Sequence, residues 1–288
     1  MSRDLALPMP PATTAPEIES TETPAVVLVV AARELRAHLR TFLAWSIPLV
    51  GMLALVCVLQ PSLANGPMAA KLESMPAMMR RAFGLELVDF QSPLAYLATN
   101  ALTFTVGTSL FAALLGASII AKEETQHTAE LLYAQPTSRA RILAGKLTAV
   151  AIYVLALPLI LGLVSTALLA AVAERPVEPA IAELWLASAA TSVCFAGLGA
   201  LVAASLRDAR TSSGATLAIV LGAYFVGVVS MMTEATEPLR YLSPFKWNEP
   251  VAIAAHGPSA LGIAGAFVIG VGAAILAVRR YHRRDLHA

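Results

Sequence analysis

Residues 122–146 read KEETQHTAELLYAQPTSRARILAGK, and they form the most polar long stretch in a chain that is otherwise mostly apolar. A long hydrophobic segment precedes this stretch, and another follows it. A polar element held between two membrane spans cannot be part of a buried core, so it must face water or a water-soluble partner. We therefore expect the rest of the chain to form the membrane-embedded frame that presents it.

The composition sets the class of protein. Of the 288 residues, 57% are hydrophobic and only 14% are charged, and the mean hydropathy is +0.70. Soluble domains carry about 25% charged residues, so this chain is predicted to be an integral membrane protein with the lipid membrane as its solvent. The net charge of +1 gives no indication of nucleic-acid binding. Cys57 and Cys194 lie in apolar segments without metal-site spacing, which predicts buried thiols and no metal site.

Two regions are predicted. Residues 1–24 are rich in Pro, Thr and Glu and are expected to be a disordered tail. Residues 25–288 are expected to form an all-α polytopic membrane domain with six transmembrane helices. Each apolar segment is close to the roughly 20 residues that cross the hydrocarbon layer, and the six lie at about 41–60, 96–121, 147–172, 183–206, 214–233 and 259–278.

A basic segment precedes the first span. Between residues 25 and 40, an apolar run passes into a stretch in which arginines recur at intervals of three and four, namely Arg33, Arg36 and Arg40. This pattern predicts an amphipathic helix on an anionic membrane surface. The alternative is a simple positively charged stop next to the span. Both interpretations place the segment in the cytoplasm.

The distribution of Lys and Arg gives the orientation. One set of flanks holds Arg33, Arg36, Arg40, Lys122, Arg139, Arg141, Lys146, Arg207, Arg210, Arg279, Arg280, Arg283 and Arg284. The other set holds only Lys71, Arg80, Arg81, Arg175, Arg240 and Lys246. The first set is therefore predicted to be cytoplasmic, with both termini inside. On the outer side, residues 237–247 contain prolines and aromatics and predict an interfacial or re-entrant cap.

The spans lack charged residues at their centres, although ion-coupled transporters usually need such groups. Polar residues that could line a substrate path are Asn100, Thr103, Thr108 and Ser192. Hydrogen bonding between helices is the alternative role for each of them. Small residues also recur at every fourth position in two spans, at Gly214, Ala218 and Gly222 and at Gly262, Ala266 and Gly270. Such spacing serves either packing within the chain or a homodimer seam.

The opening stretch is predicted to fold as helix, turn, helix. Residues 125–134 can form a short helix, because Pro136 prevents its continuation. Ser138 can then cap a second helix that runs through Lys146 into the third span. The short helix combines acidic side chains with apolar ones, a combination that suits docking into a groove on another protein.

The stretch resembles the cytoplasmic loop of ABC-2 type transporter permeases. That loop has an acidic pair, then Thr-x-Glu-Leu-Leu, a Pro, Ser-Arg and a Lys. The matching residues are Glu123, Glu124, Thr128, Glu130, Leu131, Leu132, Pro136, Ser138, Arg139 and Lys146. His127 stands where many relatives have Gly. Arg33, Glu34 and Leu35 resemble the connecting helix of the family, and six spans with both termini inside also fit.

The resemblance implies a permease subunit in the cell membrane that is not itself an enzyme. The chain has no phosphate-binding loop of the form G-x-x-x-x-G-K-[ST], so a separate ATP-binding subunit would use ATP and Mg²⁺ while this chain binds no cofactor. The short helix between spans two and three would be the coupling helix. A second permease chain, identical or different, would complete the path. The resemblance allows an exporter or an importer, of which we expect an exporter, and an uncharged path favours hydrophobic or amphipathic cargo.

Two other classes of membrane protein share part of this pattern. A family of intramembrane glutamic proteases has a Glu-Glu pair followed by Arg four residues after the second Glu, but Thr128 stands at that position after Glu123 and Glu124. None of the spans contains a His that could complete an acid–base site. A membrane scaffold or assembly factor would share the fold and the lack of catalytic residues, so the sequence leaves that alternative open.

Overall fold

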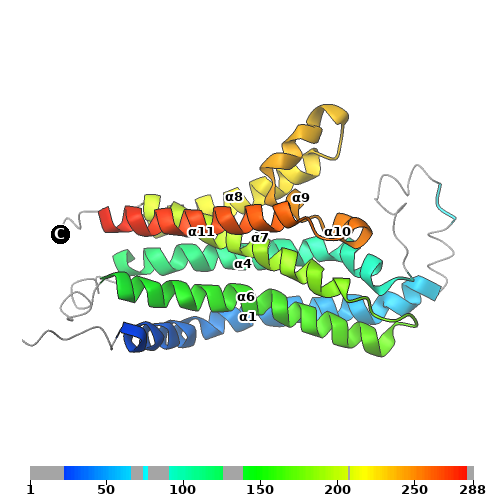
Figure 1. The fold of residues 1–288 in the computed structure, drawn as a ribbon, viewed down its shortest axis with the longest axis horizontal. Coiled ribbons are helices and arrows are strands. Elements are labelled where there is room, and N and C mark those ends of the chain that lie inside the picture. The colour runs from blue at the N-terminus through cyan, green and yellow to red at the C-terminus, as the bar shows by residue number, and fades with distance from the viewer. Residues whose placement is uncertain (1–22, 66–73, 77–90, 126–138, 207, 284–288) are drawn as a thin grey trace, which may run out of the picture.

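The computed structural model describes residues 23–65, 74–76, 91–125, 139–206 and 208–283, and within these ranges it contains helices and no strand. Six helices in the described part are long and apolar enough to cross a membrane, as the composition predicts. They are α1 (Thr23–Asn65), α4 (Pro93–Thr125), α6 (Arg139–Val172), α7 (Ala180–Ser205), α8 (Ala209–Val229) and α11 (Ala260–Arg283). Figure 1 shows them as one bundle, in which α1 begins and α11 ends at the same end.

The predicted basic segment and the first span form one helix. α1 runs for 43 residues without interruption, because residues 25–47 contain neither Gly nor Pro to end a helix near Arg40. Pro48 and Pro61 lie inside it. The predicted tail of residues 1–24 lies outside the described residues except for Thr23 and Pro24, which begin α1.

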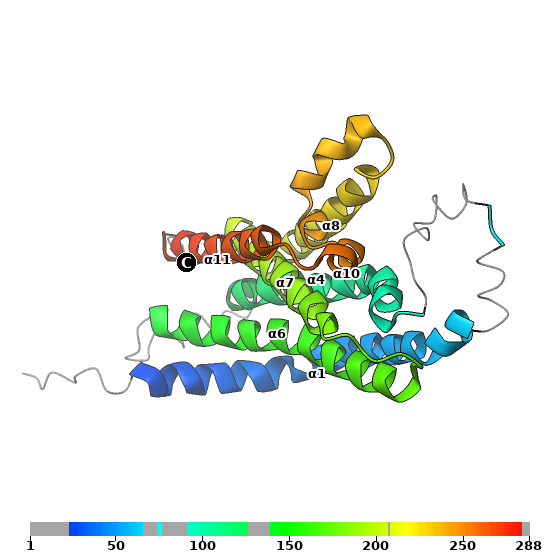
Figure 2. The same ribbon diagram turned by 45° about the vertical axis from the view of Figure 1, so that its right-hand side comes forward.

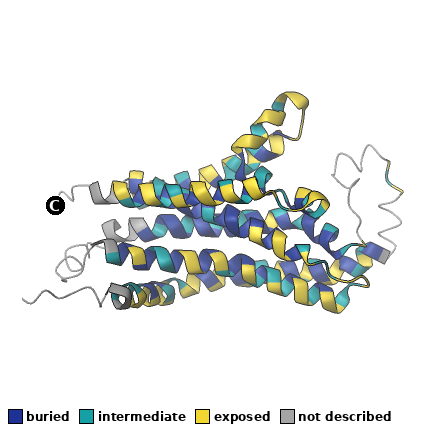
Figure 3. Ribbon diagram, viewed as in Figure 1, coloured by how far each residue is buried: buried dark blue, intermediate teal, exposed yellow. Residues whose placement is uncertain are grey.

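Helix α7 is the centre of the bundle. It packs against α4, α11 and α6, and 67% of its apolar window is buried, compared with 22% for α1 and for α8. Helices α1 and α6 form a second close pair, which lies side by side in Figures 1 and 2. Figure 3 shows buried residues in the middle of the bundle and exposed residues around it. Many of the exposed residues on the helices are large and apolar, which is the pattern of a protein whose solvent is lipid.

Glycines allow the central helices to touch through their backbones. A methyl group at Gly199 would lie 2.1 Å from the carbonyl oxygen of Ala113 on α4, and one at Gly197 would lie 1.9 Å from that of Gly270 on α11. No Cβ can be accommodated at these two positions, so the helix backbones approach this closely only because both residues are glycines. Gly197 and Gly199 therefore allow α4, α7 and α11 to pack in direct backbone contact.

The two small-residue stripes have different surroundings. The α11 stripe (Gly262, Ala266 and Gly270) is covered by α7 and by the segment before α11, since Ala266 is fully buried and methyl groups at both glycines would collide with neighbouring backbone. The α8 stripe (Gly214, Ala218 and Gly222) is exposed, and nothing lies within 4 Å of either glycine position. Packing within the chain therefore accounts for the α11 stripe alone.

The predicted cap between the last two spans is built from three short helices. They are η1 (Glu234–Leu242), α9 (Pro244–Trp247) and α10 (Pro250–His256). Pro244 and Pro250 each begin a helix, where a missing N–H costs nothing, while Pro238 is accommodated inside the 3₁₀ helix. With α8, η1 makes a hairpin that projects away from the bundle in both views (Figures 1 and 2).

Candidate functional site

The predicted ATPase-coupling residues are only partly within the described structure. Glu123 and Glu124 belong to the last turn of α4, and Arg139 begins α6. The remaining ones lie outside the described residues, namely Thr128, Glu130, Leu131, Leu132, Pro136 and Ser138. The end of α4 and the start of α6 lie at the same end of the bundle as the last turns of α11 (Figure 1).

The predicted connecting-helix residues divide between two faces of α1. Arg33, Arg36 and Arg40 are exposed, whereas Glu34 is buried. His38 lies one turn further along, with its Nε2 3.6 Å from Glu34 Oε2. The hydroxyl of Tyr153 on α6 donates a hydrogen bond to the Leu35 carbonyl. This part of α1 is therefore tied to α6 on one side and presents cations on the other.

A chain of hydroxyl groups joins α4 to α7. Ser192 Oγ donates to Thr108 Oγ1 at 3.0 Å, and Thr105 Oγ1 donates to Ser188 Oγ at 3.1 Å. Thr108 in turn donates to the Thr105 carbonyl of its own helix at 3.0 Å. All four side chains are buried. These hydrogen bonds satisfy polar groups in an apolar surrounding and hold the two helices in register.

The four residues predicted for a substrate path do not gather at one place. Thr108 and Ser192 meet in the hydroxyl chain. Asn100 is half-buried, and its side-chain amide donates to the Tyr96 carbonyl and to Thr99 Oγ1 on the same helix. Thr103 is exposed on the surface of α4. The structure therefore gives Thr108 and Ser192 a helix-packing contact and leaves Thr103 accessible.

Asn248 is a buried polar residue that the sequence did not single out. It lies between α9 and α10, and its Nδ2 donates to Thr191 Oγ1 on α7 at 3.1 Å and to the Gly262 carbonyl at 3.4 Å. It thereby ties the outer helices to the centre of the bundle. Asn248 stands between Trp247 and Glu249 in a short segment bounded by prolines, and this context is the only sign of it in the sequence. The context does not predict which residues Asn248 would hydrogen-bond.

An apolar groove of about 260 Å³ opens between α6 and α11, with α4 and α7 as its floor. Glycines of the close helix contacts form part of this floor, and aliphatic side chains form the walls. The lining residues are Gly116, Leu147, Val150, Ala151, Val154, Val193, Ala196, Gly197, Ala200, Gly270, Val271, Ala274, Ile275 and Val278. None of them carries a charge, so the groove suits an apolar molecule or chain.

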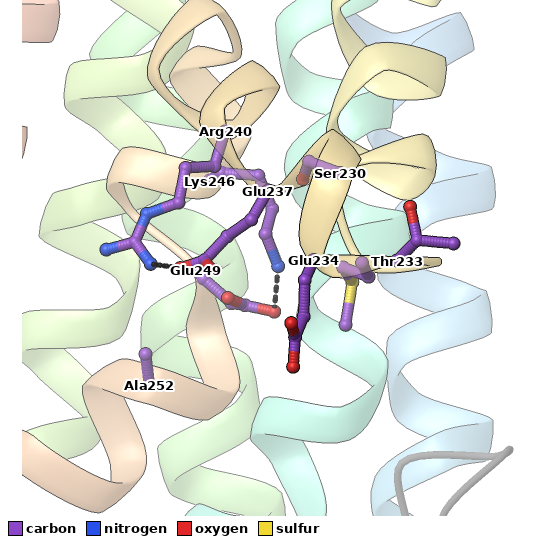
Figure 4. A pocket seen from close by; sticks show the side chains of 9 residues that line it. Ser230, Thr233, Glu234, Glu237, Arg240, Lys246, Glu249 and Ala252 are labelled. Atoms are coloured by element: carbon purple, nitrogen blue, oxygen red, sulfur yellow. Dashed lines mark hydrogen bonds and ion pairs between the residues drawn. The ribbon is translucent and has the colours of Figure 1, made fainter.

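A charged pocket of about 530 Å³ lies between the end of α8, η1, α9 and α10 (Figure 4). Two ion pairs cross it. Arg240 Nη1 lies 3.0 Å from Glu237 Oε1, and Lys246 Nζ lies 2.5 Å from Glu249 Oε1. Glu234 also lines the pocket, and in Figure 4 no dashed line joins its side chain to the other residues drawn. From the sequence, Arg240 and Lys246 contribute only to the predicted orientation, because the meeting of these charged residues depends on the fold of the hairpin.

The loop between α7 and α8 supplies a helix cap. Asp208 Oδ2 accepts hydrogen bonds from the Thr211 hydroxyl at 2.6 Å and from the Thr211 backbone N–H at 2.7 Å. These hydrogen bonds, the side-chain one first, hold the pKa of Asp208 below its ordinary value. The carboxylate therefore fixes the start of α8 at neutral pH.

The family model described as ABC-2 family transporter protein matches residues 28–286. No curated protein matches the chain.

Proposed function

The chain belongs to the ABC-2 family of transporter proteins, and from that premise we propose that it is the membrane half of an ABC exporter for hydrophobic or amphipathic cargo. Membership makes it a multi-pass transmembrane transporter subunit that is not itself catalytic, and it implies an ATP-binding partner. The cell membrane, the export direction and the cargo class are part of the proposal, as are the cytoplasmic termini.

The proposed class of cargo rests on the apolar groove between α6 and α11. Its lining offers no charge and no buried polar group that would select a hydrophilic molecule. The hydroxyls of Thr105 and Thr108 on α4 are already hydrogen-bonded to those of Ser188 and Ser192 on α7. An apolar or amphipathic molecule could enter such a groove without leaving a polar group unpaired, which is the main cost of burial in lipid.

Tryptophan substitution tests the groove. Ala151 lines it and is exposed, so Ala151→Trp would fill the space without cutting into the core. Ala167→Trp is the matched control, because Ala167 is exposed on the same helix outside the groove. We expect ATP-dependent transport of a hydrophobic dye, in vesicles that also hold the ATP-binding subunit, to fall in the first variant only. Equal transport in both variants would contradict the cargo site.

The predicted coupling helix links the spans to the partner. It joins the end of α4 to the start of α6, at the end of the bundle where the sequence places most cations. In this proposal ATP and Mg²⁺ bind to the separate subunit, whose closure presses on this helix. Glu124, in the last turn of α4, and Leu131, in the predicted coupling helix, would supply acidic and apolar contacts to that subunit.

Replacing both residues by Ala tests the coupling. We expect Glu124→Ala with Leu131→Ala to weaken co-purification of the ATP-binding subunit and to reduce transport, while the heat stability of the isolated chain is unchanged. Undiminished co-purification and undiminished transport would refute this role. A scaffold protein, in contrast, would bind its partners and show no ATP-dependent transport at all.

A second permease chain is the remaining part of the proposal. The α8 stripe is exposed and small, so it supports close approach by a helix of another chain. Single cysteines test this arrangement, since Cys57 and Cys194 are both buried. We expect Ala218→Cys on α8 to give disulfide-linked dimers in membranes, and Ala264→Cys on an exposed position of α11 to give none. The opposite result would place a like chain against α11.

A further inference from the structure

The charged pocket carries one more negative than positive side chain. Its carboxylates are Glu234, Glu237 and Glu249, and its cations are Arg240 and Lys246. Each cation is paired with one carboxylate, at 3.0 Å for Arg240–Glu237 and 2.5 Å for Lys246–Glu249. In the described part of the chain, Glu234 has neither an ion pair nor a hydrogen bond. The surplus charge of the pocket is therefore located on one known side chain.

The pocket has the size of an organic ligand. Its volume of about 530 Å³ is within the range of roughly 300–1,000 Å³ that is usual for small-molecule sites. Its three carboxylates do not converge as cation ligands do, because the described residues contain no group of three His, Cys, Asp or Glu side chains arranged to hold a metal ion. A monovalent organic cation is a better match for one surplus carboxylate in a space of this size.

The pocket has an exposed apolar border. It consists of Met231, which lines the pocket, and of Met232, Tyr241 and Leu242, which follow the lining residues Met231 and Arg240 in the chain. The exposed fractions of these four residues are 66%, 73%, 68% and 68%. Large apolar side chains this exposed, next to charges, are typical of a segment at the boundary between lipid tails and headgroups. Tyr241 in particular suits headgroup depth. A ligand that spans this border must have a polar head and an apolar tail.

The walls of the pocket are tied to the bundle. Thr236 Oγ1 donates to the Val229 carbonyl at 2.9 Å, which closes the turn from α8 into η1. Ser243 Oγ donates to the Ala223 carbonyl at 2.7 Å, which fixes the start of α9 on α8. A pocket already held in shape binds without the cost of ordering its own chain.

We propose that this pocket binds the ammonium headgroup of an amphiphile, with the Glu234 carboxylate as its counter-ion and the exposed apolar border against the first part of its tail. An anionic headgroup would add a second negative charge beside an unpaired carboxylate, so the pocket disfavours it. The ammonium group can belong to a phospholipid such as phosphatidylethanolamine or to a cationic amphiphile in the bilayer. The site is independent of whether the chain exports cargo.

Titration of the full chain in neutral detergent micelles tests the charge preference. The probes are decyltrimethylammonium and decyl sulfate, which share a tail length and differ in the sign of the head. Tryptophan emission is the signal, because Trp247, one of the three tryptophans, donates its indole N–H to the carbonyl of Tyr241 in the apolar border, at 3.0 Å. We expect a saturable emission change with decyltrimethylammonium and none with decyl sulfate.

Three variants locate the binding. Glu234→Gln should raise the half-saturating concentration of decyltrimethylammonium about threefold, the usual effect of one exposed charge pair, and Glu234→Lys should abolish saturation. Glu183→Gln is the control, because Glu183 is exposed at the start of α7 and does not line the pocket. Equal binding in wild type and Glu234→Gln, or an equal response to both probes, would overturn the proposal.

Nanodiscs then separate the two sources of the headgroup. If a phospholipid is the occupant, adding phosphatidylethanolamine to phosphatidylglycerol discs should raise the melting temperature of the wild type more than that of Glu234→Gln. If the added lipid has no effect while decyltrimethylammonium binds in micelles, the occupant is a cationic amphiphile. An absence of both effects would overturn the proposal, as would loss of binding when two chains are joined through Ala218→Cys, because a second copy would then fill the pocket.

Discussion

Replacing Gly197 by Ala should separate α7 from α11. A methyl group at Gly197 would lie 1.9 Å from the carbonyl oxygen of Gly270 and 2.7 Å from its carbonyl carbon. Both atoms are backbone, so no change of rotamer can relieve the collision. The partner position is equally tight, since a methyl group at Gly270 would lie 2.4 Å from the Val193 carbonyl oxygen.

The cost follows from the distance that the helices must move. An ordinary carbon–oxygen contact is about 3.3 Å, so the backbones must separate locally by more than about 1 Å. The buried cluster of Ala190, Cys194 and Ala266 beside this contact then loses packing. Overpacking of this kind costs about 1–3 kcal/mol, and the better helix propensity of Ala returns only about 0.5–1 kcal/mol. We expect a net loss of about 1–2 kcal/mol for Gly197→Ala.

Gly222→Ala on the exposed face of α8 is the matched control. Nothing lies within 4 Å of a methyl group at this position, so only the propensity gain remains and the variant should be as stable as wild type or slightly more stable. Reversible unfolding in mixed micelles, followed by tryptophan emission, measures both differences. Equal shifts for Gly197→Ala and Gly222→Ala would refute the close contact between α7 and α11.

Three further substitutions test single contacts. The pKa of Asp208 is lowered in the fold by its hydrogen bonds from Thr211, so the stability that this cap adds is complete above the ordinary pKa of about 4 and is lost as the pH falls through the lower folded value. Asp208→Ala should melt below wild type at pH 7, and the difference should shrink in acid. Glu178 accepts a hydrogen bond from the hydroxyl of Ser92, which directly precedes α4, at 2.7 Å, and one from the Leu94 backbone N–H in the first turn of α4, at 3.1 Å. Glu178→Ala should therefore cost about 1–3 kcal/mol and speed hydrogen exchange at the start of that helix. Ser165 accepts from the buried Trp185 indole at 3.0 Å, so Ser165→Ala should cost about 1–3 kcal/mol of unfolding free energy, whereas Ser213→Ala on exposed α8 should cost little.

The spans could be predicted from sequence because membrane insertion depends on the length and apolarity of each segment alone. The ends of the helices could not, because a helix continues into water until a residue stops it. α1 begins at Thr23, well before the predicted span at residue 41, since residues 25–47 contain neither Gly nor Pro. The structure therefore agrees with the predicted helix over residues 25–40. It differs from the prediction in that this helix is continuous with the first span.

The polar residues inside the spans could be identified from the sequence, but their hydrogen-bond partners could not. Thr108 and Ser192 are 84 positions apart, and their contact exists only because α4 and α7 are brought close by Gly116 and Gly199, at which methyl groups would lie 2.2 and 2.1 Å from carbonyl oxygens of the facing helix. The charged pocket is a similar case. Glu249 lies near Lys246 in sequence, but Glu234 joins them only when η1 folds back along the end of α8.

The two small-residue stripes show most clearly what spacing leaves undecided. Both repeat at every fourth residue in an apolar helix, so their sequence patterns are equivalent. In α8 the buried side chains are Ser212, Thr216, Val220 and Gly227. The first three precede the α8 stripe by two residues each, and two residues turn an α-helix by about 200°. Because Ser212, Thr216 and Val220 face the bundle, the α8 stripe lies on the opposite side of the helix and points away from the bundle. On α11 none of the described residues on the side opposite the stripe is buried in this way. The α11 stripe itself faces the bundle, and Gly270 fits against Gly197. Two features thus decide whether a small-residue stripe faces the bundle. One is whether the opposite side of the same helix is buried, and the other is whether the neighbouring helix has a glycine at the point of contact.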